Sequence, residues 1–220
     1  MREKLRGLRR ALRRSGVPDL DDLPPFVDSA SYWESRYRLG QTSGAGSFNE
    51  VAAFKAEVLN SFVAETGVRT VVELGCGDGN QLALADYPHY VGYDVAPAAV
   101  EQCRARFRKD RTKTFRLYDA ATFPRDEQSD LALSLEVIFH LVEDDVFEQH
   151  MRDLFSVAGR FVGICSSNDE VPDIGDHVRN RRFTDWVDQH CPEWDLVRHV
   201  ANPHPGAGVD PDLWFYARPV

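Results

Sequence analysis

The stretch Val71-Val72-Glu73-Leu74-Gly75-Cys76-Gly77-Asp78-Gly79 decides the fold that we expect for this chain. An apolar, β-branched run followed at once by closely spaced glycines predicts a buried strand that ends in a tight turn. Glycine lets the backbone turn sharply there and approach a ligand closely. A helix after the turn can point its free N–H groups at a polar group of that ligand. The alternative is a glycine-rich turn that binds nothing.

The spacing of these glycines discriminates between two kinds of cofactor. A dinucleotide-binding turn reads G-x-G-x-x-G, whereas this one reads G-x-G-x-G, with Glu73 two residues before Gly75. A carboxylate repels a pyrophosphate, but it attracts S-adenosylmethionine (SAM), which carries a sulfonium and an ammonium. The turn therefore predicts a SAM site that includes Glu73, Gly75, Cys76 and Gly77.

Strand and helix patterns alternate along the rest of the chain. Their alternation predicts a mostly parallel sheet with helices on both faces and with ligands at the carboxyl ends of the strands. The last two strands are joined by about a dozen residues, which suits an antiparallel hairpin better than a crossover. Strands are expected at 70–74, 89–94, 113–118, 130–135, 160–165, 194–200 and 213–218, and helices at 29–40 (capped by Ser29 or Ser31), 47–64, 97–107, 144–156 and 182–190.

Two acidic residues close the second and third expected strands. Asp94 follows the glycine turn by ~20 residues, a position from which a carboxylate can accept hydrogen bonds from both ribose hydroxyls. Asp119 closes the third strand, where it can accept a hydrogen bond from the adenine amino group. The alternatives are that Asp94 caps the turn before Pro97 and that Asp119 caps a helix.

Together these motifs resemble the class I SAM-dependent methyltransferases. Residues 73–79 are similar to the first motif of that family, Asp94 to its ribose-binding acid, Asp119 to its adenine-side acid and residues 129–136 to its fourth-strand motif, with Leu135 on the cofactor. The resemblance implies a Rossmann-like, seven-stranded sheet, mostly parallel with an antiparallel C-terminal hairpin, plus N-terminal helices. It assigns residues 29–220 to a methyltransferase domain and leaves 1–28 as a basic N-terminal segment and linker.

Three further segments resemble a bacterial subgroup of this family: Tyr32–Tyr37, Ser43–Ser47 and Val137–Asp144. Many members of the subgroup act on sugars or other small hydroxylated metabolites, which implies O-methylation of a sugar or an oligosaccharide. We expect Tyr32 and Ser43 on the cofactor, because an aromatic face attracts a sulfonium. The alternative for the aromatic residues is a cluster that only packs in the core.

Glu136 and His140 are the candidate catalytic residues, since they follow the fourth strand and, if the segment is helical, share one helix face. Methylation of an alcohol requires a group that removes the hydroxyl proton, and histidine suits that role near neutral pH. Glu136 then orients the imidazole or holds a substrate hydroxyl. The alternative is a helix-capping His140 and a solvated Glu136. On the acceptor side we expect His177, Arg181 and His204, for which the alternative is an ordinary surface position.

Composition narrows the class of partner. The 220 residues carry a formal net charge of −9, whereas a nucleic-acid site usually has a basic footprint, so a small-molecule acceptor is favoured. The chain shows no apolar run near the ~18 residues of a membrane helix, which predicts a cytoplasmic protein without stable membrane insertion. No Cys-x-x-Cys pair is present, and the three candidate histidines are far apart in sequence, so we expect no metal.

Several alternatives stay open from sequence. The basic segment 1–14 has leucines at helical spacing, which predicts either a solvated terminal helix or a helix that docks on an acidic partner or a membrane surface. A homodimer is compatible with the sequence. The function itself has two alternatives: N-methylation of a small amine, and a non-catalytic partner protein that binds SAM as a regulator.

Overall fold

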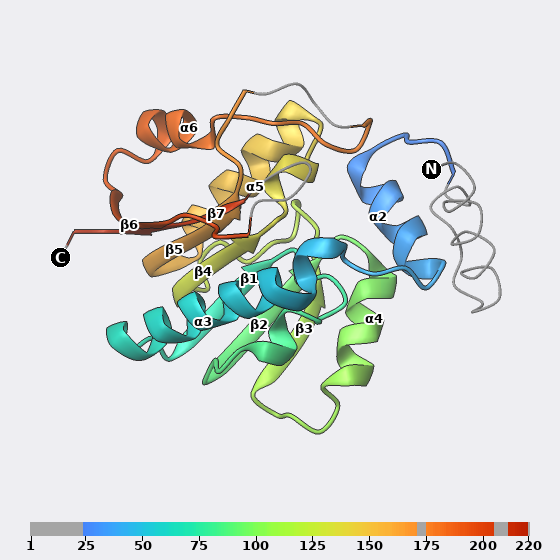
Figure 1. Cartoon of the computed structure of the whole chain (residues 1–220), viewed down its shortest axis with the longest axis horizontal. Helices are drawn as coiled ribbons and strands as arrows, with labels where there is room; N and C mark the ends of the chain where they lie inside the picture. Colours follow the sequence, from blue (N-terminus) through green and yellow to red (C-terminus); the bar gives the residue numbers. More distant parts are fainter. Residues whose placement is uncertain (1–23, 171–174, 205–210, 220) are drawn as a thin grey trace.

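A seven-stranded sheet forms the centre of the computed structural model, which describes residues 24–170, 175–204 and 211–219 (Figure 1). The strand order is β3-β2-β1-β4-β5-β7-β6. The expected α/β class and the Rossmann-like, mostly parallel sheet are confirmed. The strands are β1 (Thr70–Leu74), β2 (His89–Asp94), β3 (Lys113–Leu117), β4 (Ser129–Leu135), β5 (Ala158–Ser166), β6 (Asp195–Val200) and β7 (Asp212–Ala217).

The direction of the strands places the ligand-binding edge. β1 pairs in parallel with β2 and β4, β2 with β3, and β4 with β5. β7 is antiparallel to β5 and β6, so the expected C-terminal hairpin is confirmed. The strand order reverses between β1 and β4, and open α/β sheets bind ligands beyond the carboxyl ends of the strands at such a reversal.

Helices cover both faces of the sheet. They are α2 (Ser29–Arg38), α3 (Asn49–Thr66), α4 (Pro97–Arg106), α5 (Asp144–Ser156) and α6 (Phe183–His190). Successive β1 residues point to opposite faces, so Val71 packs in a cluster with Leu59 of α3 and Val72 packs in another with Met151 of α5. Each apolar side chain buried in these layers contributes roughly 1.5–3 kcal/mol to folding.

The ends of the elements lie within one or two residues of those expected, with two local corrections. Asp28 caps α2, because its Oδ1 accepts a hydrogen bond from Ser31 N at 2.7 Å; Ser29 and Ser31 are inside the helix. α3 begins at Asn49, since Ala45–Ser47 form a separate 3-10 helix. The expected basic helix at 1–14 lies outside the described residues. Within the described part, no helix is long and apolar enough to cross a membrane.

Candidate active site

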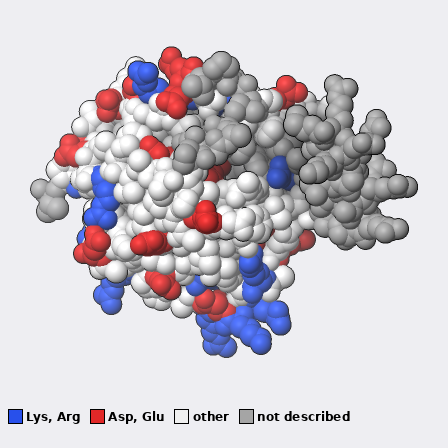
Figure 2. Space-filling view, viewed as in Figure 1, with Lys and Arg blue, Asp and Glu red and all other residues white. Residues whose placement is uncertain are grey.

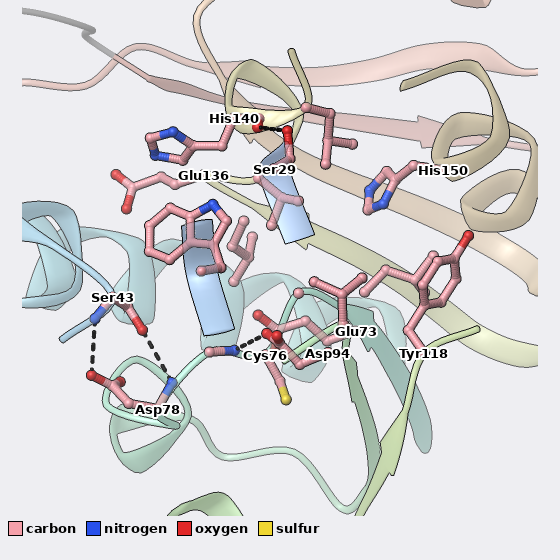
Figure 3. A pocket seen from close by; sticks show the side chains of 18 of the residues that line it. Ser29, Ser43, Glu73, Cys76, Asp78, Asp94, Tyr118, Glu136, His140 and His150 are labelled. Atoms are coloured by element: carbon pink, nitrogen blue, oxygen red, sulfur yellow. Dashed lines mark hydrogen bonds between the residues drawn. The ribbon is translucent and has the colours of Figure 1, made fainter. Parts of the chain in front are cut away.

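A cavity lies at the carboxyl ends of β1, β2 and β4 (Figure 3). α2 borders the cavity through Ser29, Trp33 and Tyr37. In Figure 3, Glu136 and His140 lie on one side, Tyr118 and His150 on the other, and Cys76 and Asp94 between them.

The glycine turn after β1 is held by its neighbours on two sides. Gly77 has φ 56°, a left-handed conformation that favours glycine, and a Cβ there would overlap the Ser43 hydroxyl. Gly77 N donates to Asp94 Oδ2 at 2.8 Å. Ser43 N donates to Asp78 Oδ2 at 3.0 Å, and Asp78 N donates back to Ser43 Oγ at 3.1 Å. The loop before α3 therefore docks on the turn, which puts Ser43 at the cavity wall.

Two buried carboxylates face this cavity. Glu73 is 4% exposed and accepts a hydrogen bond from Tyr90 Oη at 2.6 Å; burial raises the pKa of Glu73 to about 7. Asp94 is 6% exposed and accepts from Gly77 N and from Ala96 N, the latter at 2.9 Å. Burial raises the pKa of Asp94 to about 6.

These buried carboxylates fit SAM. A carboxylate has about four lone-pair positions, so each Asp94 oxygen can still accept a bond from a ribose hydroxyl while it holds its backbone N–H. The raised pKa values of Glu73 and Asp94 mean that neither carboxylate has a cationic partner strong enough to offset its burial. A ligand that carries positive charge supplies such a cationic partner. Cys76 also borders the cavity as a neutral thiol, since the neighbouring Cys103 thiol and burial raise the pKa of Cys76.

Glu136 occupies an unusual position after β4. Its backbone is left-handed, with φ 58°, a conformation that costs a non-glycine residue of order 1–3 kcal/mol and tends to occur at functional sites. Glu136 Oε2 lies 2.8 Å from Nζ of Lys55, a residue of α3 that is 1% exposed. A Cβ at Gly46 would overlap the Glu136 carboxylate. The backbone, the lysine and the glycine together hold that carboxylate at the cavity wall.

Lys55 was missed by the sequence reasoning, although its sequence position carries a signal. The buried residues of α3 recur at helical spacing: Ala52, Lys55, Ala56, Leu59, Phe62 and Val63. A lysine within such a stripe is unusual, because lysine is almost never fully buried unless it is paired. The stripe therefore indicates a buried partner, but it does not identify that partner as Glu136.

The segment after Glu136 corrects one expectation. Ile138–His140 form a 3-10 helix. The expectation that Glu136 and His140 share one face of an α-helix is therefore wrong. His140 Nδ1 lies 2.9 Å from the backbone oxygen of His177. A carbonyl oxygen only accepts, so Nδ1 carries the proton and Nε2 keeps its lone pair. The imidazole is thus oriented by His177, while Glu136 pairs with Lys55.

Burial also sets the charge of this imidazole. Desolvation lowers the pKa of His140 to about 4, so the ring is neutral at neutral pH. The ring packs edge-to-face with the Trp33 indole at a centroid distance of 4.9 Å. A neutral imidazole with one free lone pair at a cavity wall is able to accept a proton.

The aromatic residues of α2 divide between the cavity and its outer side. Trp33 and Tyr37 border the cavity, and Tyr37 Oη is 3.1 Å from Ser43 Oγ. Tyr32, expected on the cofactor, instead stacks on His177 at 4.7 Å, and His177 stacks on His140 at 5.6 Å. Arg36, one helical turn further along α2, donates to the Tyr32 hydroxyl at 3.2 Å.

α2 is fastened at both of its ends. At the start of the helix, Ser29 N donates to Glu143 Oε1 at 2.9 Å, and Ser29 Oγ donates to the backbone oxygen of His140 at 2.8 Å (Figure 3). At its far end, Tyr37 contacts Ser43, which in turn bonds Asp78 of the glycine turn. The helix thus links the His140 segment to the glycine turn.

Besides Tyr32 and His177, three expected site residues lie outside the cavity lining. Asp119 is exposed and accepts from Ala121 N at 2.9 Å; its neighbour Tyr118 borders the cavity instead. Arg181 donates to the Leu141 and Val142 backbone oxygens and to Asp144, which fixes the segment after His140. His204 lies 3.6 Å from Glu50 near the start of α3. Leu135 does border the cavity.

His150 and the metal question complete the description of the site. His150 of α5 borders the cavity and its Nε2 lies 2.9 Å from Ser134 Oγ, while burial lowers the pKa of His150 to about 4. Among the described residues, no cluster of three or more His, Cys, Asp or Glu side chains is arranged to hold a metal ion. His150, Tyr118 and Lys55 are thus additions to the residues expected from sequence.

Comparisons with known proteins agree with this fold. Residues 71–159 match the family model described as a methyltransferase domain. The solved structure of magnesium protoporphyrin IX methyltransferase from Synechocystis PCC 6803 with bound SAM is similar at a TM-score of 0.67 and 15% sequence identity. The match covers 89% of this chain and 100% of that chain.

Two curated proteins are similar to part of the chain. Small RNA 2'-O-methyltransferase of Arabidopsis thaliana is 30% identical over 108 residues, which cover 43% of this chain and 12% of that protein. Trans-aconitate 2-methyltransferase of Methylobacterium radiotolerans is 38% identical over 74 residues, which cover 32% of this chain and 27% of that protein. The matches thus span only a small part of the length of these relatives.

Proposed function

We propose that this chain is a class I SAM-dependent methyltransferase, which the matched methyltransferase domain supports, and that it methylates a hydroxyl of a small uncharged acceptor such as a sugar or an oligosaccharide. The observation that carries the proposal is the neutral His140 imidazole at the cavity wall. SAM supplies a methyl group already activated by its sulfonium, so the chain has to bind, orient and deprotonate the acceptor. Residues 29–220 are the proposed catalytic domain.

His140 Nε2 is the proposed proton acceptor. The acceptor oxygen gains positive charge as it is methylated, which makes its proton far more acidic than that of a free alcohol. A base with a pKa of about 4 is therefore able to take that proton, and general bases typically contribute ~10²–10⁴-fold in rate. The bond from Nδ1 to the His177 carbonyl keeps the ring in the tautomer that this role needs.

Glu136 and Lys55 favour a hydroxyl over an amine at this site. The Glu136 carboxylate can accept a hydrogen bond from an acceptor hydroxyl through the oxygen that Lys55 does not hold. Lys55 cancels the charge of that carboxylate, so the pair offers little net attraction to an ammonium group. A lone carboxylate would instead select a cationic amine.

The distribution of charge supports a small acceptor over RNA. Figure 2 shows Lys and Arg side chains gathered at the lower edge of the molecule, where Figure 1 places the loop between α4 and β3. Exposed Arg108, Lys109 and Arg111 lie along this stretch. The loop leads into the amino end of β3, so this group lies at the edge of the sheet opposite the cavity. The net charge of −9 adds no attraction for a polyanion.

SAM binding is expected to strengthen with pH, because the ionised forms of Glu73 and Asp94 attract a cation. Their pKa values of about 7 and about 6 predict that the dissociation constant falls roughly tenfold or more between pH 5.5 and 7.5. The same linkage lowers the unfolding free energy of the SAM-free chain as pH rises through this range, since the folded state holds the extra protons. Calorimetry in buffers of different ionisation enthalpy measures the protons released, and an affinity that does not change with pH would contradict the assignment.

A screen of matched acceptors tests the proposed reaction. The full chain is incubated with methyl-labelled SAM and with sugars, their amino-sugar counterparts, small carboxylates and a short RNA. We expect labelled product from the hydroxyl member of a sugar pair and little from its amine counterpart. Transfer only to amines would support the N-methylation alternative, transfer only to RNA would overturn the small-acceptor proposal, and no SAM binding at millimolar ligand would remove the reaction altogether.

A further inference from the structure

Asp153 is a buried carboxylate that no step of the proposed reaction uses. It lies on α5 and its side chain is 0% exposed. It accepts hydrogen bonds from Tyr118 Oη at 2.6 Å, from Arg125 Nε at 2.5 Å and Nη2 at 3.2 Å, and from Gln149 Nε2 at 2.9 Å. A buried aspartate that accepts this many hydrogen bonds holds its donors in fixed positions.

Two of these donors stand at the ends of one loop. Tyr118 follows β3 directly, and Arg125 comes seven residues later. Arg125 also donates to the backbone oxygen of Ala120 at 2.7 Å, and the ring of Phe123 packs on that of Tyr118 at 5.3 Å. Asp153 therefore ties both ends of the segment 118–125, a loop that starts at the cavity, to α5.

Tyr118 is the part of this network that reaches the cavity. It borders the cavity on the same side as His150, opposite His140 (Figure 3). Its hydroxyl is occupied by Asp153, so the ring is what a ligand meets. Burial and Asp153 raise the pKa of Tyr118, which keeps the hydroxyl a donor at neutral pH. In the strand order β3-β2-β1, Tyr118 lies one strand beyond the carboxylate of Asp94, at the end of the site where the base of a nucleoside extends past its ribose.

We propose that Asp153 is a positioning residue for the cofactor: it fixes the Tyr118 ring and the 118–125 loop against the adenine end of SAM. The inference rests on SAM as the cofactor and is independent of the acceptor, so it stands or falls separately from O-methylation. Asp153 touches no ligand itself and acts through Tyr118. Replacing it by asparagine keeps the shape but turns one acceptor into a donor that faces the donors of Tyr118 and Arg125.

Calorimetric binding of S-adenosylhomocysteine to the full chain tests this role without any methyl acceptor. We expect Asp153→Asn to raise the dissociation constant about tenfold and Tyr118→Phe to raise it about threefold, each with unchanged stoichiometry. The double variant is expected to match Asp153→Asn alone, because both changes break one interaction. Glu148→Gln, an exposed change on the same helix that breaks only the pair with Arg152, is the matched control and is expected to bind as the parent does.

Stoichiometry separates positioning from folding. A purely structural role for Asp153 lowers the fraction of binding-competent protein and leaves the dissociation constant of the remainder unchanged. That result, or effects of the two single variants that multiply in the double variant, would overturn the proposal. If Asp153→Asn fails to fold, Tyr118→Phe decides alone, because it removes only one oxygen atom and keeps the ring. A dissociation constant within twofold of the parent rejects the role, and a threefold rise supports it.

Discussion

The His140→Ala variant is expected to bind SAM as tightly as the parent chain and to lose about 10²-fold or more in kcat for a hydroxyl acceptor. The imidazole borders the cavity with its Nε2 lone pair free, because Nδ1 is committed to the His177 carbonyl. Alanine removes the base without touching Glu73 or Asp94, so the cofactor contacts remain. Calorimetry with SAM and steady-state turnover of the best acceptor from the screen measure the two quantities separately.

The pH dependence gives a second signature of the same base. The neutral ring is the active form, and its pKa is about 4, so kcat of the parent is expected to stay flat above pH 6 and to fall as pH drops toward 4. The variant should lack this fall. His89→Ala is the matched control, since His89 is exposed at the amino end of β2, away from the cavity. Turnover by His140→Ala equal to that of the parent would remove the base role and favour an amine acceptor.

The Lys55→Met variant is expected to have the largest effect on stability, a loss of about 3 kcal/mol in the free energy of unfolding. Methionine preserves the apolar stem of Lys55 but leaves the Glu136 carboxylate without its cation in a largely buried position. Removing one partner of a buried ion pair is costly because the other charge stays desolvated. Urea denaturation of the SAM-free chain, followed by circular dichroism, measures the change.

Two comparisons show whether the loss comes from the unpaired charge. Lys55→Met combined with Glu136→Gln is expected to recover most of the stability, because the neutral pair leaves no buried charge. Arg152→Met removes an exposed partner of Glu148, where both side chains are about half exposed, and such pairs contribute ~0.3–0.5 kcal/mol. A Lys55→Met chain within 0.5 kcal/mol of the parent, or a double variant less stable than the single one, would contradict the assigned ion pair.

Features that depend on local sequence were predictable. The strand from Thr70 to Leu74, its glycine turn and the acid at the end of β2 follow from residues adjacent in the chain, and the structure places Glu73, Cys76 and Asp94 at one cavity. At the end of β3, where we expected the adenine contact, the same reasoning selected the wrong one of two adjacent residues. Neighbouring residues at the end of an extended strand point in opposite directions, so Tyr118 borders the cavity while Asp119 faces solvent.

Features that depend on contacts between distant segments were not predictable. The Lys55–Glu136 pair joins residues 81 positions apart, and the His140 tautomer depends on a backbone oxygen 37 positions away. In each pair, no pattern in the sequence around one residue identifies the distant residue that contacts it. Arg181 and His204 were expected at the site because of their residue type, but Arg181 instead caps backbone oxygens of the segment after His140 and His204 lies beside Glu50.

The fastening of α2 at both ends has a thermodynamic consequence. Ser29 holds one end to the His140 segment, and Tyr37 with Ser43 holds the other to the glycine turn. A helix that the protein itself holds at both ends has little conformational entropy left to lose when a ligand binds against it. Preorganisation of this kind favours the binding of any ligand that contacts α2, although it adds no contact of its own.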